Sequence, residues 1–210
     1  MVITSLKKYR GRLYRLEFDD NEAQMVDIAT FNESPYKIGS TLTDRQLEEL
    51  VTQSNKRRAK EKALYLLSMR DHSFDELEKK LRLVADSKTA AETAEQMQSL
   101  GYIDDERFAK QRAEYLINRK LYPKKRAIME LCRLGVDREI AQNATESIES
   151  NDVSQALALL NKKHYNKKSC NEHIKKAAAS LARYGFDSYT IRRAIEMWHT
   201  EEQDFGIDEL

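Results

Sequence analysis

Two patterns of hydrophobic and polar positions divide the chain near residue 53. The segment LYRLEF at 13–18 alternates apolar and polar side chains, and residues typical of turns lie on both sides of it. This alternation predicts two or three strands between Val2 and Phe31. Thr43 and Gln46 then form a capping box that opens a helix. We therefore expect residues 1–52 to form a small mixed β/α domain.

After residue 53 the apolar residues recur at helical spacing, and many positions match when the chain is shifted by 50 residues. The matching positions are apolar, aromatic or helix-capping: Leu81, Leu131 and Leu181; Ala94, Ala144 and Ala194; Tyr65, Tyr115 and Tyr165; Ala59, Ala109 and Leu159; Ser87, Asp137 and Asp187. A constant shift of this kind indicates an internal repeat. It predicts repeats at 53–103, 104–150 and 151–199, followed by an acidic tail at 200–210.

Each repeat is expected to hold three helices, bounded by capping residues and helix breakers. The predicted helices are 56–70, 74–84 and 88–100, then 105–120, 123–134 and 138–149, and finally 153–165, 172–184 and 188–198. The predicted fold class is mainly α, with three tandem three-helix repeats forming an elongated curved array behind a small N-terminal β-containing domain.

Two similar phrases, RLGVDRE at 133–139 and RYGFDSY at 183–189, mark the same turn in the last two repeats. Gly135 and Gly185 are suited to a positive φ at a helix end, and the Asp two residues later caps the next helix. The first repeat has Ala85 in place of the glycine, so its turn must be built differently or its helix must continue. We interpret both phrases as structural, without a catalytic role.

Composition supports a helical protein and limits its location. The chain has 210 residues, of which 34% are charged, with six Gly, two Pro and a mean hydropathy of −0.74. No apolar run approaches the roughly 18 to 20 residues of a membrane span, and the N-terminus has no apolar signal core. We therefore expect a cytoplasmic protein without membrane contact. Cys132 and Cys170 are interpreted as ordinary reduced thiols.

The sequence contains no convincing set of catalytic or metal-binding residues. Its four histidines are scattered, and none pairs with another His or Cys at a spacing typical of a metal site. Phosphate-binding loops of the GxxxxGK[ST] or GxGxxG type are also missing from the sequence. We predict that the protein is not an enzyme and uses no metal or cofactor.

Clusters of basic residues are the strongest functional signal. Residues 151–199 contain nine Lys or Arg against four acidic residues, whereas residues 200–210 contain five acidic residues and no basic one. Such clusters bind nucleic-acid phosphates or acidic protein surfaces, and the sequence does not separate these; in the first two repeats an ordinary solvated surface is the alternative. The candidate binding residues are Lys124, Lys125, Arg126, Lys162, Lys163, Lys167, Lys168, Lys175, Lys176, Arg192 and Arg193.

Three stretches of the repeats resemble the RecX family of regulatory proteins, which bind and modulate the RecA recombinase. They are ALYLLSMRDHSFDELEKKL, SLGYIDDERFAKQRAEYLINRK and RAIMELCRLGVDREIAQNA, and GYIDDERFA is the most specific part. The resemblance covers residues 56–199. The chain departs from the family at Ala85 and at LYP, residues 121–123, where many members have a glycine.

The resemblance implies a regulator that lies along the RecA filament on single-stranded DNA. It would most readily inhibit recombinase, ATPase and co-protease activities in DNA repair and the SOS response. The implied partners are RecA and single-stranded DNA, with double-stranded DNA as a further candidate, and we expect a monomer. The alternative function is a stand-alone DNA-binding protein that acts through charge- and shape-based contact.

Overall fold

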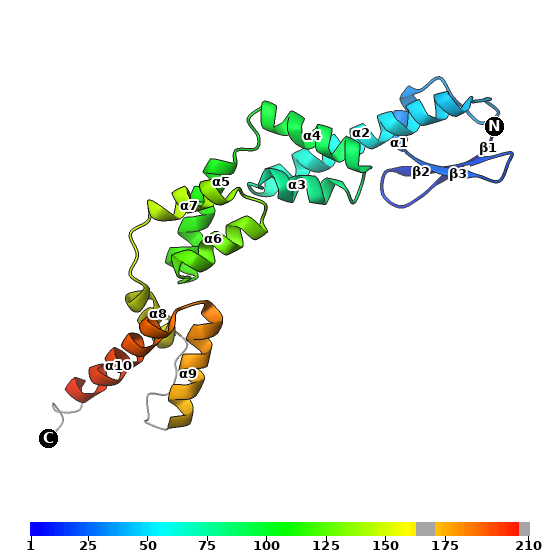
Figure 1. Ribbon diagram of the computed structural model, residues 1–210. Helices are drawn as coiled ribbons and strands as arrows, with labels where there is room; N and C mark the ends of the chain where they lie inside the picture. Colours follow the sequence, from blue (N-terminus) through cyan, green and yellow to red (C-terminus); the bar gives the residue numbers. More distant parts are fainter. Residues whose placement is uncertain (163–170, 206–210) are drawn as a thin grey trace. The chain divides into compact units, whose positions relative to one another are not determined.

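The computed structural model describes residues 1–162 and 171–205, with side chains described for 1–162 and 172–199. The chain forms two compact units, Met1–Asp104 and a second unit that begins at Asp105. Ten α-helices, one π-helical turn and a three-stranded sheet make up the described part (Figure 1). The predicted class, mainly α with a small N-terminal β-containing domain, is confirmed.

The N-terminal sheet is antiparallel and contains β1 (Ile3–Lys8), β2 (Leu13–Phe18) and β3 (Ala23–Asp27) in that order. The period-two pattern of β2 places Leu16 and Phe18 in the core, where both are buried. They pack with residues of the short helix α1 (Ile28–Glu33) and of the helix that follows. The predicted strands are therefore confirmed.

The long helix α2 (Asp44–Met69) joins the sheet to the first repeat. Its predicted capping box is present, because Thr43 and Gln46 bond to each other's backbone and side chain. The prediction that a separate helix begins at residue 56 is wrong. No Gly or Pro interrupts residues 44–69, so the helix continues without a break. The domain boundary after residue 52 falls within it and stays a prediction.

The three repeats share one packing scheme. The first contains α2, α3 (Phe74–Leu81) and α4 (Ser87–Ser99). The second contains α5 (Asp105–Glu114) with its π-helical extension η1 (Tyr115–Arg119), then α6 (Lys124–Arg133) and α7 (Arg138–Glu146). The third contains α8 (Asp152–Lys162), α9 (Asn171–Tyr184) and α10 (Ser188–Phe205), and the prediction for 163–165 lies outside the described residues. In every repeat the first and second helices both pack against the third.

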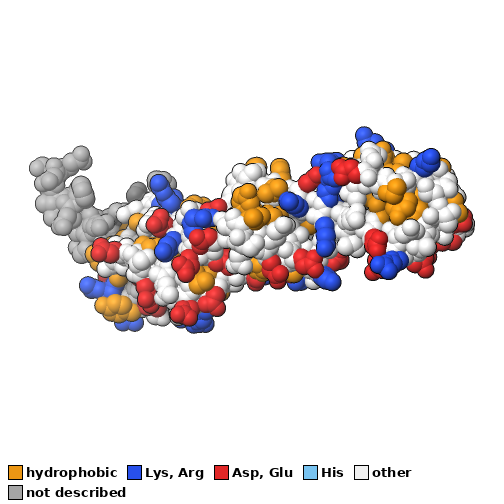
Figure 2. Space-filling model, turned by 90° about the horizontal axis from the view of Figure 1, so that it is seen from above, with side chains coloured by type: hydrophobic (Ala, Val, Ile, Leu, Met, Phe, Trp, Pro, Cys, Tyr) orange, Lys and Arg blue, Asp and Glu red, His pale blue; other side chains and the backbone are white. Residues whose placement is uncertain are grey.

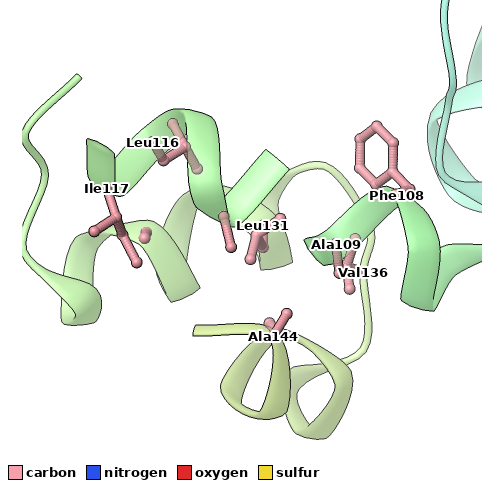
Figure 3. Packing of buried hydrophobic residues seen from close by; sticks show 10 residues of the cluster. Phe108, Ala109, Leu116, Ile117, Leu131, Val136 and Ala144 are labelled. Atoms are coloured by element: carbon pink, nitrogen blue, oxygen red, sulfur yellow. The ribbon is translucent and has the colours of Figure 1, made fainter. Parts of the chain in front are cut away.

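Equivalent apolar residues fill equivalent positions in the three repeats. Leu81, Leu131 and Leu181 are fully buried, as are Ala94 and Ala194. Figure 3 shows this core in the second repeat, where Leu131, Val136 and Ala144 face the helix that carries Ala109. The leucine and alanine positions that recur with the shift of 50 residues are therefore core positions, and the repeat is confirmed.

The predicted helix-ending turns are present in the second and third repeats. Gly135 and Gly185 have φ angles of 87° and 94°. The following Val136 and Phe186 are buried, and their N–H groups donate to the carbonyls of Leu131 and Leu181, five residues earlier. Asp137 and Asp187 cap the next helices with bonds of 2.7 Å to backbone N–H groups, as expected.

The first repeat ends its second helix differently, as Ala85 requires. The helix stops at Leu81, and the N–H of Val84 donates to the Leu81 carbonyl at 2.9 Å without any residue at positive φ. The predicted cap Ser87 is wrong. Asp86 is the N-cap, because its carboxylate accepts both the N–H and the hydroxyl of Thr89.

The second repeat departs from the predicted geometry at 115–123. The expected helix 105–120 changes at Tyr115 into the π-helical turn η1, and Leu121 adopts a positive φ of 57°, in the stretch where the resemblance implied a glycine. A left-handed conformation costs a non-glycine residue about 1–2 kcal/mol. The Leu121 side chain packs against the core of the third repeat, which offsets this cost. Pro123 occupies the N-cap position just before α6, without a side-chain capping bond, whereas the sequence predicts it as the first residue of that helix.

Candidate interaction surface

The first candidate residues lie at the start of α6. Lys124 donates from Nζ to the carbonyl of Glu146 at 3.4 Å, within the second repeat. Lys125 is exposed, and no hydrogen bond or ion pair occupies its ammonium group among the described residues. It lies close enough to the carboxylate of Asp187 to help lower the pKa of that group, after the larger effect of hydrogen bonds from Thr190.

Arg126 makes contacts inside the second unit, between its two repeats. Its Nη1 donates to the carbonyl of Arg183, near the end of α9, at 2.6 Å. Its guanidinium lies 4.0 Å from the ring centre of Tyr122 and 5.5 Å from that of Tyr184. These two rings also contact each other edge to face, at 5.6 Å. The Arg126 guanidinium is therefore largely engaged within the protein.

The third repeat carries the remaining candidates. Lys162 ends α8, Lys175 and Lys176 lie on the exposed face of α9, and Arg192 and Arg193 lie on that of α10. Two of the five have ion-pair partners: Lys176 bonds to Glu172 at 2.8 Å, and Arg193 to Glu196 at 3.2 Å. The candidates Lys163, Lys167 and Lys168 lie outside the described residues.

Four candidate side chains project into solvent without an ion pair in the described part of the chain: Lys125, Lys162, Lys175 and Arg192. Of these, Lys125 lies near the carboxylate of Asp187. Elsewhere basic and acidic groups are mixed, and Figure 2 shows Lys and Arg interspersed with Asp and Glu over the visible face. An ion-paired side chain gives up its pair when it contacts a partner, at a cost of about 0–1 kcal/mol for an exposed pair, whereas an unpaired one has no such cost. The four unpaired residues are the strongest of the candidates.

The two repeats of the second unit also meet through acidic groups. Burial raises the pKa of Asp152, and the nearby carboxylate of Asp187 raises it further, against the effect of Lys124. The side-chain amide of Gln155 donates to the carbonyl of Ile117 at 3.1 Å, in the interior. The basic start of α6 therefore faces polar groups of the third repeat as well as solvent.

The described residues contain no group of three or more His, Cys, Asp or Glu side chains arranged to hold a metal ion. Cys132 is half-buried and free, and Cys170 lies outside the described residues. Across the part of the chain that the structure covers, no helix is both long and apolar enough to cross a bilayer.

Two exposed tyrosines were not among the candidate residues. Tyr65 and Tyr115 are among the positions that recur with the shift of 50 residues. An aromatic residue that recurs in this way is usually interpreted as part of the core. In the structure their exposed fractions are 58% and 41%. The sequence signal that could have identified them is a basic residue three positions before each tyrosine, which recurs with the same shift of 50.

The fold and this surface define a class of protein: tandem three-helix repeats behind a small N-terminal sheet, with basic residues exposed on the helices. The model of "RecX, second three-helix domain" matches residues 104–144. The regulatory protein RecX of Prosthecochloris aestuarii is 30% identical over 148 residues, which cover 70% of this chain and 97% of that protein. The chain belongs to the RecX family of regulatory proteins.

The similarity extends over whole chains. The regulatory protein RecX of Caldanaerobacter subterraneus is 27% identical over 199 residues, 94% of this chain and 100% of that protein. Two solved structures share the fold. A crystal structure of regulatory protein RecX has a TM-score of 0.58 with 18% identity and covers 93% of this chain, and RecX from Lactobacillus salivarius has a TM-score of 0.56 with 23% identity and covers 70%.

Proposed function

We propose that this protein binds the RecA nucleoprotein filament and lowers its recombinase, ATPase and co-protease activities. It would act as a monomer in the cytoplasm, during DNA repair and the SOS response. The observation that carries the proposal is the similarity to a regulatory protein RecX over that protein's entire length. The sheet and all three repeats are therefore matched, and the regulatory role is proposed for the whole chain.

The candidate basic residues supply the contact surface in this proposal, with the unpaired Lys125, Lys162, Lys175 and Arg192 as its main members. A single exposed charge pair contributes only about 0.2–1 kcal/mol, so affinity would arise from many such contacts. Electrostatic contacts of this kind accelerate association and weaken as salt rises. The candidates Lys163, Lys167 and Lys168 lie outside the described residues and stay part of the proposed set of binding residues.

The ATP hydrolysis of RecA on single-stranded DNA tests this function. The expected result is a decrease that grows with the concentration of this protein and reaches a plateau. The same titration without DNA controls for an effect on the assay itself. An unchanged rate at saturating protein would contradict the proposal.

A second candidate function is direct DNA binding without a recombinase, which the excess of basic residues in 151–199 favours. The chain offers a matched comparison, because Lys175→Ala with Arg192→Ala removes two unpaired charges from α9 and α10. The pair Lys176→Ala with Arg193→Ala removes two charges that are ion-paired on the same helices.

In a titration with labelled DNA, the first pair should weaken binding more than the second. It should also reduce the slope of log affinity against log salt by about two, roughly one for each lost phosphate contact. Equal effects of the two pairs would show that these residues do not contact DNA directly.

A further inference from the structure

The first helices of the first two repeats carry the same exposed pair of side chains. In α2, the ammonium of Lys62 lies 5.2 Å from the ring centre of Tyr65. At the end of α5, the guanidinium of Arg112 lies 5.2 Å from the ring centre of Tyr115. The two pairs occupy positions exactly one repeat of 50 residues apart, and each forms within its own unit.

Packing does not explain why these tyrosines recur. The other recurring positions, such as Leu81 and Leu131, are fully buried, whereas Tyr65 and Tyr115 are about half-exposed. The sequence of the third repeat has the same pair at Lys162 and Tyr165, although Tyr165 lies outside the described residues. Burial in the core therefore does not account for the recurrence of this aromatic residue together with its cation.

The π-helical turn adds a second cation at Tyr115. In η1 the N–H of Lys120 donates to the carbonyl of Tyr115, five residues earlier, at 3.0 Å. This wider turn brings the Lys120 ammonium to 5.7 Å from the ring centre of Tyr115. Neither Arg112 nor Lys120 has an acidic partner among the described residues, and π-helical turns are frequent at functional sites.

Tyr65 lies at a basic cleft of about 340 Å³ within the first unit. The turn between β1 and β2 forms one side and α2 forms the other, and four cations line it: Arg10, Arg12, Arg58 and Lys62. The only acidic side chains there are Glu61, which bonds to Arg12 at 2.9 Å, and the buried Asp27. Arg10 and Arg58 have no acidic partner in the described part of the chain, so the cleft keeps an excess of positive charge.

We propose that these tyrosine sites bind single-stranded nucleic acid, with a base stacked on each exposed ring and the flanking cations holding the adjacent phosphates. A nucleic-acid strand offers flat bases, which stack on exposed aromatic rings, and negatively charged phosphates, which pair with cations that have no acidic partner. An acidic peptide would use the cations but would leave the rings without a flat partner. The inference extends the DNA contact proposed above to different residues, and its test needs no recombinase.

The test measures fluorescence anisotropy of a labelled single-stranded oligonucleotide with the full-length protein. Stacking on one aromatic side chain accounts for about a 5- to 150-fold gain in affinity, so the double variant Tyr65→Ala, Tyr115→Ala should bind at least about 25-fold more weakly. The conservative variant Tyr65→Phe, Tyr115→Phe keeps both rings and should bind within about twofold of the wild type. Met129→Ala, which removes another exposed apolar side chain, serves as the control.

Several outcomes would overturn the inference. They are no measurable binding by the wild type, an unchanged affinity in the double Ala variant, or an equal loss in the Phe variant. A protein partner would be indicated if the double Ala variant lost binding to DNA-free RecA while its affinity for the oligonucleotide stayed the same. Because all residues involved are exposed, the thermal unfolding midpoints of the variants should match that of the wild type.

Discussion

The guanidinium of Arg126 shows how a basic residue can serve the fold. It satisfies the Arg183 carbonyl, one of the last carbonyls of α9, which has no partner inside its helix. It also stacks on the ring of Tyr122. Gly185 packs directly against the Arg126 side chain, since a Cβ atom added to the glycine would lie 3.4 Å from the Cβ and Cδ of Arg126, and its φ angle of 94° is what favours glycine.

Replacing Arg126 with Ala should therefore destabilise the second unit by about 1–3 kcal/mol, since a hydrogen bond and a cation–ring contact are lost together. Urea unfolding measures this change. Arg133→Ala is the control: its side chain is 82% exposed, and its ion pair with Glu130 is long, at 3.9 Å. It should change stability by less than about 0.5 kcal/mol. Equal losses would mean that Arg126 does not hold the repeats together.

His72 gives the first unit a dependence on pH. The residue is buried, its ring Nδ1 donates to the carbonyl of Arg70 at 2.9 Å, and burial lowers the pKa of the imidazole below its usual value of about 6.5. The unfolded chain then takes up a proton more readily than the folded one. Stability is complete above about pH 6.5 and decreases as pH falls from there through the folded pKa.

The unfolding midpoint of the first unit should consequently fall between pH 7.5 and pH 5.5. His72→Asn keeps a donor near Nδ1 and removes the titration, so its midpoint should fall less over the same range. Burial acts to raise the pKa of Glu76, but the hydrogen bonds and charge of Arg70, together with the charges of His72 and Lys80, lower it overall, and its contribution is lost only below about pH 4.5. Identical pH profiles for the two proteins would exclude His72 as the cause.

At the residue scale, the sequence predicts the role of a residue when neighbouring residues determine it. It does not predict the role of a residue whose contacts come from distant parts of the chain. Gly135 and Gly185 were predictable, because a helix end before a capping Asp requires a positive φ. The role of Arg126 was not, since its partners Tyr184 and Arg183 lie nearly 60 residues away. The basic candidates were chosen from charge alone, which does not distinguish the ion-paired Lys176 from the unpaired Lys175.

Among the elements, α2 has a role that the sequence did not reveal. The hydroxyl of Ser54, fully buried in the middle of the helix, accepts the N–H of Asp27 at the end of β3 at 2.7 Å. Arg57, one turn further on, bonds to Glu33 of α1 at 2.7 Å. The same helix then packs against α3 and α4. One element therefore holds both the sheet and the first repeat.

Ser54→Ala should destabilise the first unit by about 1–3 kcal/mol, because the buried N–H of Asp27 would lose its partner. The neighbouring Gln53→Ala, on the exposed face of the same helix, should have little effect. Chemical denaturation followed by circular dichroism compares the two variants. A loss in Ser54→Ala no larger than that in Gln53→Ala would contradict a connecting role for this hydroxyl.

The predicted elements were most accurate where capping residues and breakers mark them. Eight of the nine predicted repeat helices begin within one residue of the observed start, and the exception is the one placed at 56. That error arose because a second helix was expected after the capping box at Thr43, and nothing in the sequence stops the first. The π-helical turn at Tyr115 has no comparable marker in the sequence.

For the whole molecule, the repeat found in the sequence gives the correct fold class, and family membership agrees with it. The predicted boundaries of the individual repeats and of the N-terminal domain stay predictions, and the structure forms two compact units that are divided in the sequence between Asp104 and Asp105. The binding partner cannot be derived in the same way, because contacts within the protein carry no information about what its surface binds. The regulatory role therefore depends on similarity to RecX relatives and on the exposed basic residues.

Direct binding to an assembled filament tests the central claim of this account. RecA filaments formed on immobilised single-stranded DNA, DNA-free RecA and bare DNA would each be titrated with this protein at the same ionic strength. The account predicts tightest binding to the filament, and affinity that decreases as salt rises. Binding to the filament no tighter than to bare DNA or to DNA-free RecA would contradict it.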